Sequence, residues 1–259
     1  MVIRSNLEKF GYKFGQSGAH SARSMMLAEL RSLFQTASIE ASREQLQIDI
    51  CNHNLLNKPT VKSRKLTYRH LVDLYGLSID IPIFRVFRIL WPLSEDAQPV
   101  LALQMALARD PLLRLSQDLV VDTSLGAQVS REDTEELLKA PDPERFSPAS
   151  LKSFAQNING SWTQAGFLKG KARKIRVRPI VSFPNVVFAM YLTYLEGATG
   201  ERLFRGRWAS LLGLSENQLS EQAMVAAQRG IIDFKQSGGV TEVRFTQFLR
   251  LEEEQWSYE

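Results

Sequence analysis

The sequence predicts a mainly α-helical protein with two helical lobes, of which the C-terminal lobe carries short β-hairpins in a winged-helix-like arrangement. Three observations predict this fold class. Apolar residues recur at helical spacing along most of the chain, serines, threonines and prolines stand where helices begin, and a Gly-Gly turn joins two alternating strands near the end. With 44% hydrophobic residues among 259, the chain can bury a substantial core.

The N-terminal part is expected to consist almost entirely of helices. Residues 1–16 are expected to form a short strand or an arm, because Gly11 and Gly15 interrupt any continuous helix. A helix is expected after the cap Ser130, with the acidic run 132–136 in its first turns, where negative charge is stabilising. N-terminal to Ser130, the spacing of apolar residues predicts helices over residues 21–36, 42–56, 61–75, 79–93, 97–109 and 112–120.

The segment from Ala140 to Pro143 is the clearest hinge in the chain, because two prolines fall within it. We expect the domain boundary there. The predicted organisation is an N-terminal helical domain at 1–139, a linker at 140–146, a C-terminal helical domain with hairpin wings at 147–251 and an acidic tail at 252–259.

The C-terminal domain is expected to alternate helices with strand pairs. Ser147 followed by Pro148 starts a helix that runs to about Gly166. Further helices are expected over residues 183–196, 202–212 and 216–229, and short strands over 167–168, 175–177, 230–235 and 240–245. The order of helix, glycine turn and strand pair occurs twice, at 148–180 and 215–245. It is the order of a winged helix-turn-helix, in which a helix enters the major groove and a hairpin touches phosphates.

The charge is distributed unevenly along the chain. The formal net charge is +4, but residues 1–92 carry 13 Lys and Arg against 7 Asp and Glu, and residues 147–251 carry 14 against 6. Residues 93–146 carry 5 against 11. Two basic regions that flank an acidic middle indicate a polyanionic partner more strongly than the total charge does.

Two basic segments are the candidate nucleic-acid-binding sites. The first is a turn in the C-terminal domain without any acid, and its candidate residues are Lys169, Lys171, Arg173, Lys174, Arg176 and Arg178. The second is a stripe on the helix predicted at 61–75, made of Lys62, Lys65 and Arg69 and bordered by Arg64. Phosphate contacts from such residues release counterions and make affinity fall with salt. The alternatives are a solvated helix face, a soluble loop, or a docking surface for an acidic protein.

No motif assembles an active site, so we expect a protein that is not an enzyme and uses no cofactor or metal. His20, His53 and His70 lack metal-ligand spacing, and no P-loop, GxGxxG or GxSxG pattern occurs. A Ser-His-Asp triad assembled by the fold stays open. The one cysteine, Cys51, is expected to be a buried thiol. The sequence shows neither a bilayer-spanning apolar stretch nor a secretion signal, so we expect a cytoplasmic protein without a membrane partner.

Four phrases of the sequence resemble the BrxA family of bacterial BREX phage-defence systems. They are GAHSARSMMLAEL at 18–30, NLLNKPTVKSRKLTYRHLVDLYGL at 54–77, SPASLKSFAQNINGSWTQAGFLKGK at 147–171 and WASLLGLSENQ at 208–218. The resemblance implies a small, cytoplasmic, largely helical protein with NusB-like character. It also implies association with DNA and action beside a methyltransferase, an ATPase and a phosphatase-like protein.

On this resemblance, the positions expected to contact a nucleic-acid backbone are Lys62, Arg64, Lys65, Arg69, Lys169 and Lys171. The N-terminal arm, acidic linker and acidic tail are longer than a compact member needs, so a divergent relative in another methylation-linked defence island is an alternative. The leading expectation is a non-enzymatic accessory protein of an antiphage system that grips double-stranded DNA through two basic faces. A protein-docking adaptor and an RNA-binding regulator of the antitermination type remain alternatives.

Overall fold

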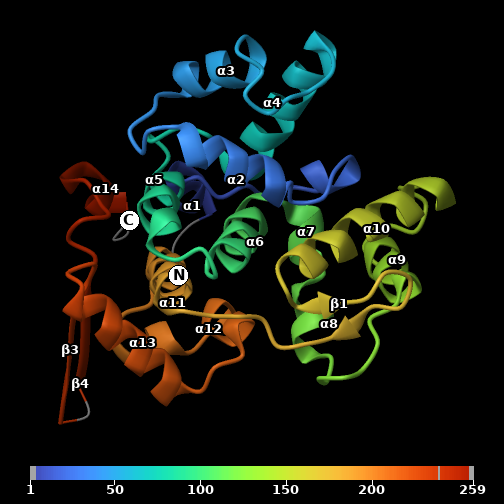
Figure 1. Cartoon of the computed structure of the whole chain (residues 1–259). Coiled ribbons are helices and arrows are strands. Elements are labelled where there is room, and N and C mark those ends of the chain that lie inside the picture. Colours follow the sequence, from blue (N-terminus) through green and yellow to red (C-terminus); the bar gives the residue numbers. More distant parts are fainter. Residues whose placement is uncertain (1–3, 239, 257–259) are drawn as a thin grey trace.

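The predicted fold class is confirmed, since the chain is mainly helical and carries two antiparallel sheets of two strands each (Figure 1). The structure is a computed structural model and describes residues 4–238 and 240–256. Its first elements are α1 (Arg4–Phe10), η1 (Ala19–Ser21), α2 (Leu27–Thr36), α3 (Arg43–Cys51), α4 (Val61–Tyr75), α5 (Pro82–Leu90), η2 (Trp91–Leu93), α6 (Gln98–Arg109), α7 (Pro111–Leu115), α8 (Gln117–Asp122) and α9 (Arg131–Lys139). They are followed by α10 (Pro148–Gln164), β1 (Leu168–Lys169), β2 (Ile175–Arg176), α11 (Phe183–Leu195), η3 (Gly200–Phe204), α12 (Arg207–Leu212), α13 (Glu216–Gln228), β3 (Asp233–Ser237), β4 (Val240–Arg244) and α14 (Leu251–Trp256).

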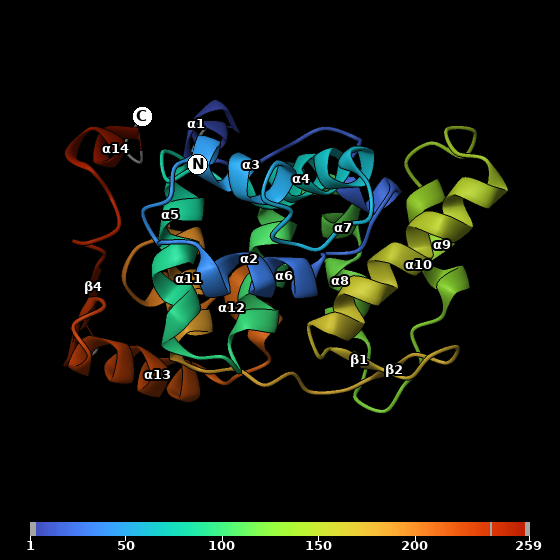
Figure 2. The same cartoon turned by 45° about the horizontal axis from the view of Figure 1, so that its top comes forward.

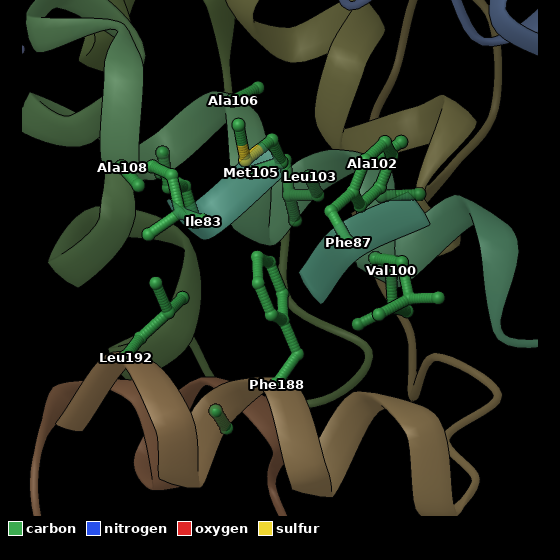
Figure 3. Close-up of a cluster of buried hydrophobic side chains, with 14 of the residues drawn as sticks. Ile83, Phe87, Val100, Ala102, Leu103, Met105, Ala106, Ala108, Phe188 and Leu192 are labelled. Atoms are coloured by element: carbon green, nitrogen blue, oxygen red, sulfur yellow. The ribbon is translucent and has the colours of Figure 1, made fainter. Parts of the chain in front are cut away.

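Helix α6 forms the centre of the core. Every residue from Val100 to Arg109 is buried, because α4, α5, α7, α10 and α11 all pack on this helix. Figure 3 shows Phe87 of α5 and Phe188 of α11 among the α6 side chains, and their ring centroids are 6.1 Å apart. Burial of each such side chain stabilises the fold by about 1.5–3 kcal/mol. The apolar α11 is in turn covered by α12 and α13.

The predicted boundary at 140–146 does not divide the core. It connects α9 to α10, and these two helices pack against each other, with the rings of Phe146 and Phe154 5.1 Å apart. One connected cluster of buried side chains includes residues from both sides of the boundary, such as Leu103 and Phe188. The two prolines therefore end one helix and reverse the chain, and they do not join two separately packed lobes.

The N-terminal residues form a helix instead of the expected arm or strand. Helix α1 ends at Phe10, where Gly11 has a left-handed φ of +107°. Phe10 and Tyr12 are buried, and the Tyr12 hydroxyl donates to the carbonyl of Leu192 at 3.1 Å. This aromatic segment belongs to the core, because its rings contact Trp208 of α12 and Trp256 of α14.

The acidic tail predicted at 252–259 begins as helix α14, and its residues 257–259 lie outside the described residues. Glu253 is buried and accepts from the guanidinium of Arg85 in α5. Trp256 packs on Phe10 with ring centroids 5.5 Å apart. The first residues of the tail therefore close over α1 and α5.

Several predicted helices are shorter in the structure. The helix expected at 21–36 begins at Leu27, because Met26 has a left-handed backbone, and the one expected at 42–56 ends at Cys51. The helix expected at 112–120 is split into α7 and α8 at Ser116, whose side chain bonds back to the carbonyl of Leu113. Cys51 is partly buried. No helix in the described part of the chain combines the length and apolar character that crossing a bilayer requires.

Candidate nucleic-acid interface

The first basic segment is a hairpin that is anchored along one side. β2 pairs antiparallel with β1, and its other edge bonds to residues 126–129. The amide of Val129 donates to the carbonyl of Lys174 at 3.0 Å, and the amide of Gly126 donates to the carbonyl of Arg176 at 2.9 Å. The turn at 170–173 is exposed beyond this anchor.

The turn of this hairpin requires glycine. Gly170 has φ +112°, and a Cβ there would lie 2.1 Å from the carbonyl oxygen of Arg173. A larger residue would therefore push the two sides of the turn apart. This tight turn determines the backbone positions from which the cations of the hairpin project.

The structure divides the six cations of the hairpin into three groups. Lys169, Lys171, Arg173 and Arg178 are exposed, and none of them contacts a carboxylate within the described residues. Lys174 is partly buried, and its Nζ donates to the carbonyl of Gly170 at 3.0 Å. These five side chains are available at the surface, although Lys174 also closes the turn.

Arg176 is buried, and it is the predicted binding residue whose placement differs most from expectation. Only 6% of it is exposed, and its Nε donates to the carbonyl of Val120 at 2.9 Å. Its Nη1 donates to the carbonyls of Phe167 and Val177. Burial lowers the pKa of Arg176, and Arg178 lowers it further. The guanidinium joins α8 to the hairpin. Arg176 is therefore not part of the candidate interface, because its donors are used inside the protein.

The second basic segment is α4, whose predicted bounds agree with the structure. Thr60 caps it in a box with Ser63, and Gly76 follows its last residue with φ +88°. The expected stripe of Lys62, Lys65 and Arg69 is exposed and without a carboxylate partner among the described residues. Arg64 is half-buried and directs Nη1 to the carbonyls of Cys51 and Asn52 at 3.4 and 3.5 Å, so it mainly holds α3 against α4.

Helix α10 lies between α4 and the hairpin in both views of the molecule (Figures 1 and 2). Its last residue, Gln164, shares the lining of a 420 Å³ groove with Ser63 and Thr67 of α4. Four residues later the chain enters β1. The two basic segments therefore flank the C-terminal end of α10.

Several cations elsewhere on the surface are paired with carboxylates. Arg205 contacts Glu216 at 2.9 Å, Arg131 contacts Glu135 at 2.8 Å, and Lys58 contacts Glu29 at 2.9 Å. Other exposed cations of the described residues, such as Arg43 and Lys139, also lack a carboxylate partner, but those at 62–69 and 169–178 follow one another in rows. Unpaired cations that gather in one place repel each other unless an anion binds there.

The predicted winged-helix units are present as helix–hairpin pairs, but their charges differ. The exposed face of α10 carries one cation, Lys152. The second hairpin is neutralised by its register, because Asp233 lies opposite Arg244 and Lys235 lies opposite Glu242. Helix α13 contains no cation. Only the first hairpin therefore offers a basic wing.

The fold does assemble a Ser-His-Asp constellation, which the sequence left open. His20 Nδ1 lies 2.9 Å from Asp110 Oδ2, and His20 Nε2 lies 2.7 Å from Ser161 Oγ. All three side chains are at most 1% exposed, and Ser161 Oγ already accepts from the amide of Met25 at 2.8 Å. A substrate has no access to this hydroxyl. The arrangement joins η1, α7 and α10 as a buried polar hub.

The other two histidines differ from each other. His53 is exposed beside Asp49, whereas His70 is buried. Across residues 4–238 and 240–256, no group of three or more His, Cys, Asp or Glu side chains is placed to hold a metal ion.

The structure contains a pocket of 560 Å³ that was not predicted from the sequence. We call it the Ser17 pocket, and its lining includes Lys13, Ser17, Arg69, His70, Asp73 and Arg109. The one sequence signal for this pocket is the glycine- and serine-rich phrase GQSGAHS at 15–21. Ser17, Gly18, Ala19 and Ser21 of this phrase line the pocket. That phrase alone could not indicate a pocket, because Arg69 and Arg109 reach it from distant helices.

Comparisons with known proteins leave the chain without an assigned family. No family model matches it, and no curated protein matches it. A solved structure described as "SspB crystal structure" is similar over 97% of this chain and 95% of its own, with 10% sequence identity and a TM-score of 0.49. At this identity and TM-score, the likeness assigns neither a family nor a function to this chain.

Proposed function

We propose that this protein is a non-enzymatic, cytoplasmic DNA-binding protein that contacts the phosphate backbone of a duplex through α4 and the β1–β2 hairpin. The observation that carries the proposal is that exposed cations without a carboxylate partner gather in two rows. Seven exposed cations of these two segments, Lys62, Lys65, Arg69, Lys169, Lys171, Arg173 and Arg178, lack a carboxylate within the described residues.

The pattern favours phosphate over a single carboxylate ligand. Four of the seven cations follow one short hairpin, and the other three follow one side of a helix, so both sets form extended rows. An extended row suits a polymer with a repeating negative charge. Direct base readout is not part of the proposal, because α10 adds only Lys152 to the surface beside the hairpin.

The biological role follows from the resemblance to the BrxA family. Under this proposal the protein is an accessory component of a BREX-type antiphage system, acting with its methyltransferase, ATPase and phosphatase-like protein. Two of the phrases that carry the resemblance meet in the buried hub, where His20 of the first lies 2.7 Å from Ser161 of the third. This contact supports treating the phrases as one structural unit.

The test is the salt dependence of duplex binding. Replacement of Lys169, Lys171 and Arg173 by alanine should weaken binding and flatten the plot of log affinity against log salt by up to about 2.7 in slope, since each lost phosphate contact removes about 0.9. The charge-matched control replaces Arg202 in η3, Arg205 directly after it and Lys235 in β3. Strand β3 lies on the opposite side of the molecule from β1 (Figure 1). The control should bind as the unaltered protein does.

Each alternative gives a different result in the same assay. Equal loss in both triple variants would show that only total charge matters and would remove the hairpin assignment. A protein-docking adaptor would leave the duplex unbound at physiological salt. An RNA-binding regulator would prefer single-stranded RNA to duplex DNA.

A further inference from the structure

We propose that the Ser17 pocket binds a phosphate group, carried either by the end of a nucleic-acid strand or by a free nucleotide. This site shares Arg69 with the row of cations on α4 but is separate from the hairpin, and it stands whether or not the hairpin binds a duplex. Its 560 Å³ exceed the size of one phosphate, so the pocket has room for the group to which the phosphate is attached.

The charge of the pocket is positive on balance. Lys13, Arg69 and Arg109 line it together with the carboxylates of Glu8 and Asp73. Both carboxylates already have cations, because Glu8 lies 3.5 Å from Arg4 and Asp73 lies 3.3 Å from Lys13. Arg69 and Arg109 remain without a carboxylate contact among the described residues. Burial lowers the pKa of Arg109 to about 10, so its guanidinium stays charged at neutral pH.

Two buried side chains of the pocket have unused hydrogen-bonding atoms. His70 is 6% exposed and Arg109 is 5% exposed. Among the described residues, Nδ1 of His70 and Nε of Arg109 find no partner. Buried polar atoms are nearly always paired, and leaving one unpaired costs about 1–3 kcal/mol. Both atoms are closed to solvent, and Nη1 and Nη2 of Arg109 already donate to the carbonyls of Gly11 and Val72. These two side chains therefore form the wall of the pocket, and the groups that a ligand can reach are Arg69, Lys13 and the loop.

The loop of the pocket adds neutral donors. Within the described residues, the amides of Ser17, Gly18 and Ala19, which line the pocket, and the hydroxyl of Ser17 have no acceptor. The loop is fixed from behind, because the amide of His20 donates to Asp110 at 3.0 Å and a Cβ on Gly18 would lie 2.0 Å from the same carboxylate. These donors are therefore held in position before any ligand arrives, which reduces the entropy lost on binding.

The set of donors fits phosphate chemistry. The guanidinium of Arg69, the ammonium of Lys13, the hydroxyl of Ser17 and backbone amides line this space. Phosphate offers enough oxygens to accept from all of them. Burial, followed by Arg69 and Arg23, lowers the pKa of His70, so the ring adds no positive charge to the wall of the pocket at neutral pH.

The experiment measures phosphate binding to the full chain by calorimetry and by phosphorus NMR. The probes are inorganic phosphate, a nucleoside monophosphate, and one short oligonucleotide carrying either a 5′-phosphate or a 5′-hydroxyl. Saturable binding of phosphate at millimolar concentration is expected. A preference for the phosphorylated oligonucleotide over the nucleoside monophosphate identifies a strand end as the source, and the reverse preference identifies a free nucleotide. Absence of saturable binding by all phosphate probes overturns the proposal.

Two variants place the binding in the pocket. Arg69→Gln and Ser17→Ala should each weaken phosphate binding by about tenfold, the effect of one lost hydrogen bond to a charged group. Lys139→Gln, at an exposed position outside the pocket lining and outside both basic segments, should leave phosphate binding unchanged. Arg69 and Ser17 are both exposed, so neither variant removes a core side chain.

The two proposals fail separately. The triple alanine variant of the hairpin should bind phosphate as tightly as the unaltered protein, and Ser17→Ala should bind duplex DNA as tightly as the unaltered protein. Unchanged phosphate affinity in Arg69→Gln, or equal losses in Arg69→Gln and Lys139→Gln, would overturn the pocket assignment and leave the hairpin proposal unaffected.

Discussion

The carboxylate of Asp110 fixes the ring of His20 in a place that solvent does not reach. Their atoms Oδ2 and Nδ1 lie 2.9 Å apart, although the two residues are 90 positions apart in the chain. The other oxygen of Asp110 accepts from the amides of Leu112 and Leu113 and starts α7. One side chain thus caps a helix and holds the loop of the Ser17 pocket.

Asp110→Asn should destabilise the protein by about 3 kcal/mol, because a buried charged group is removed and the one remaining oxygen cannot accept both from His20 and from the amides of Leu112 and Leu113. Urea unfolding followed by circular dichroism near neutral pH measures this change. Asp96→Asn, at an exposed position, is the matched control and should change stability little. Equal stability of the two variants would show that the hub is not important for folding.

The same pair predicts a pH dependence. Burial raises the pKa of Asp110, but His20 and the backbone hydrogen bonds outweigh it, so its pKa lies below the ordinary value. A depressed carboxyl pKa stabilises the fold above the unfolded-state value of about 3.9, and that contribution is lost as pH falls through the folded-state pKa. The stability gap between the unaltered protein and Asp110→Asn should stay constant down to about pH 5 and shrink below about pH 4. A gap that does not depend on pH would contradict this assignment.

Arg176 and Arg178 should respond to alanine in opposite ways. Arg176→Ala removes bonds to buried carbonyls and should destabilise the protein by about 2 kcal/mol or more. Arg178→Ala should leave thermal stability nearly unchanged and weaken duplex binding, because its side chain is exposed. Thermal unfolding and duplex titration of both variants separate the structural arginine from the binding one. The assignment fails if Arg178→Ala is the less stable protein.

Gly170→Ala should distort the basic turn. Its φ of +112° and the 2.1 Å approach of the Arg173 carbonyl leave no space for a methyl group. Gly213→Ala is the control, since Gly213 also has a positive φ, +63°, but open space around it. The control carries only the conformational penalty, about 1 kcal/mol. The Gly170 variant should in addition lose duplex affinity, and identical affinities would show that the shape of the turn is unimportant.

Glu253 should fasten helix α14. It is 2% exposed, it pairs with Arg85, and its Oε2 accepts from the amide of Arg250 at 2.8 Å. Glu253→Ala leaves a partly buried guanidinium without its partner and should cost about 2 kcal/mol. Hydrogen exchange of the α14 amides should accelerate in this variant and stay unchanged in Glu252→Ala, whose side chain is exposed. Slow exchange in both would show that apolar contacts alone hold the helix.

Local signals predicted the helical elements well. The ends of α4 are determined by residues beside them, the capping box of Thr60 and Ser63 and the left-handed Gly76. The caps Ser130 and Ser215 act in the same way. Short elements without such signals were missed. Helix α14 is one, because contacts with α1 and α5, far away in the sequence, stabilise it.

The sequence by itself determined the helical fold, the hairpin turns and the two rows of cations, because caps, periodicity and charge are properties of neighbouring residues. Only the tertiary structure decided which cations are free. Arg176 and Arg178 belong to the same basic run of the sequence and nothing local distinguishes them. In the structure Arg176 donates to buried carbonyls, whereas Arg178 is exposed to solvent. The Ser17 pocket and the contact of His20 with Ser161, 141 residues away, also belong to the tertiary structure. Such arrangements depend on how whole helices pack, and side-chain partners so distant in the chain leave no local pattern.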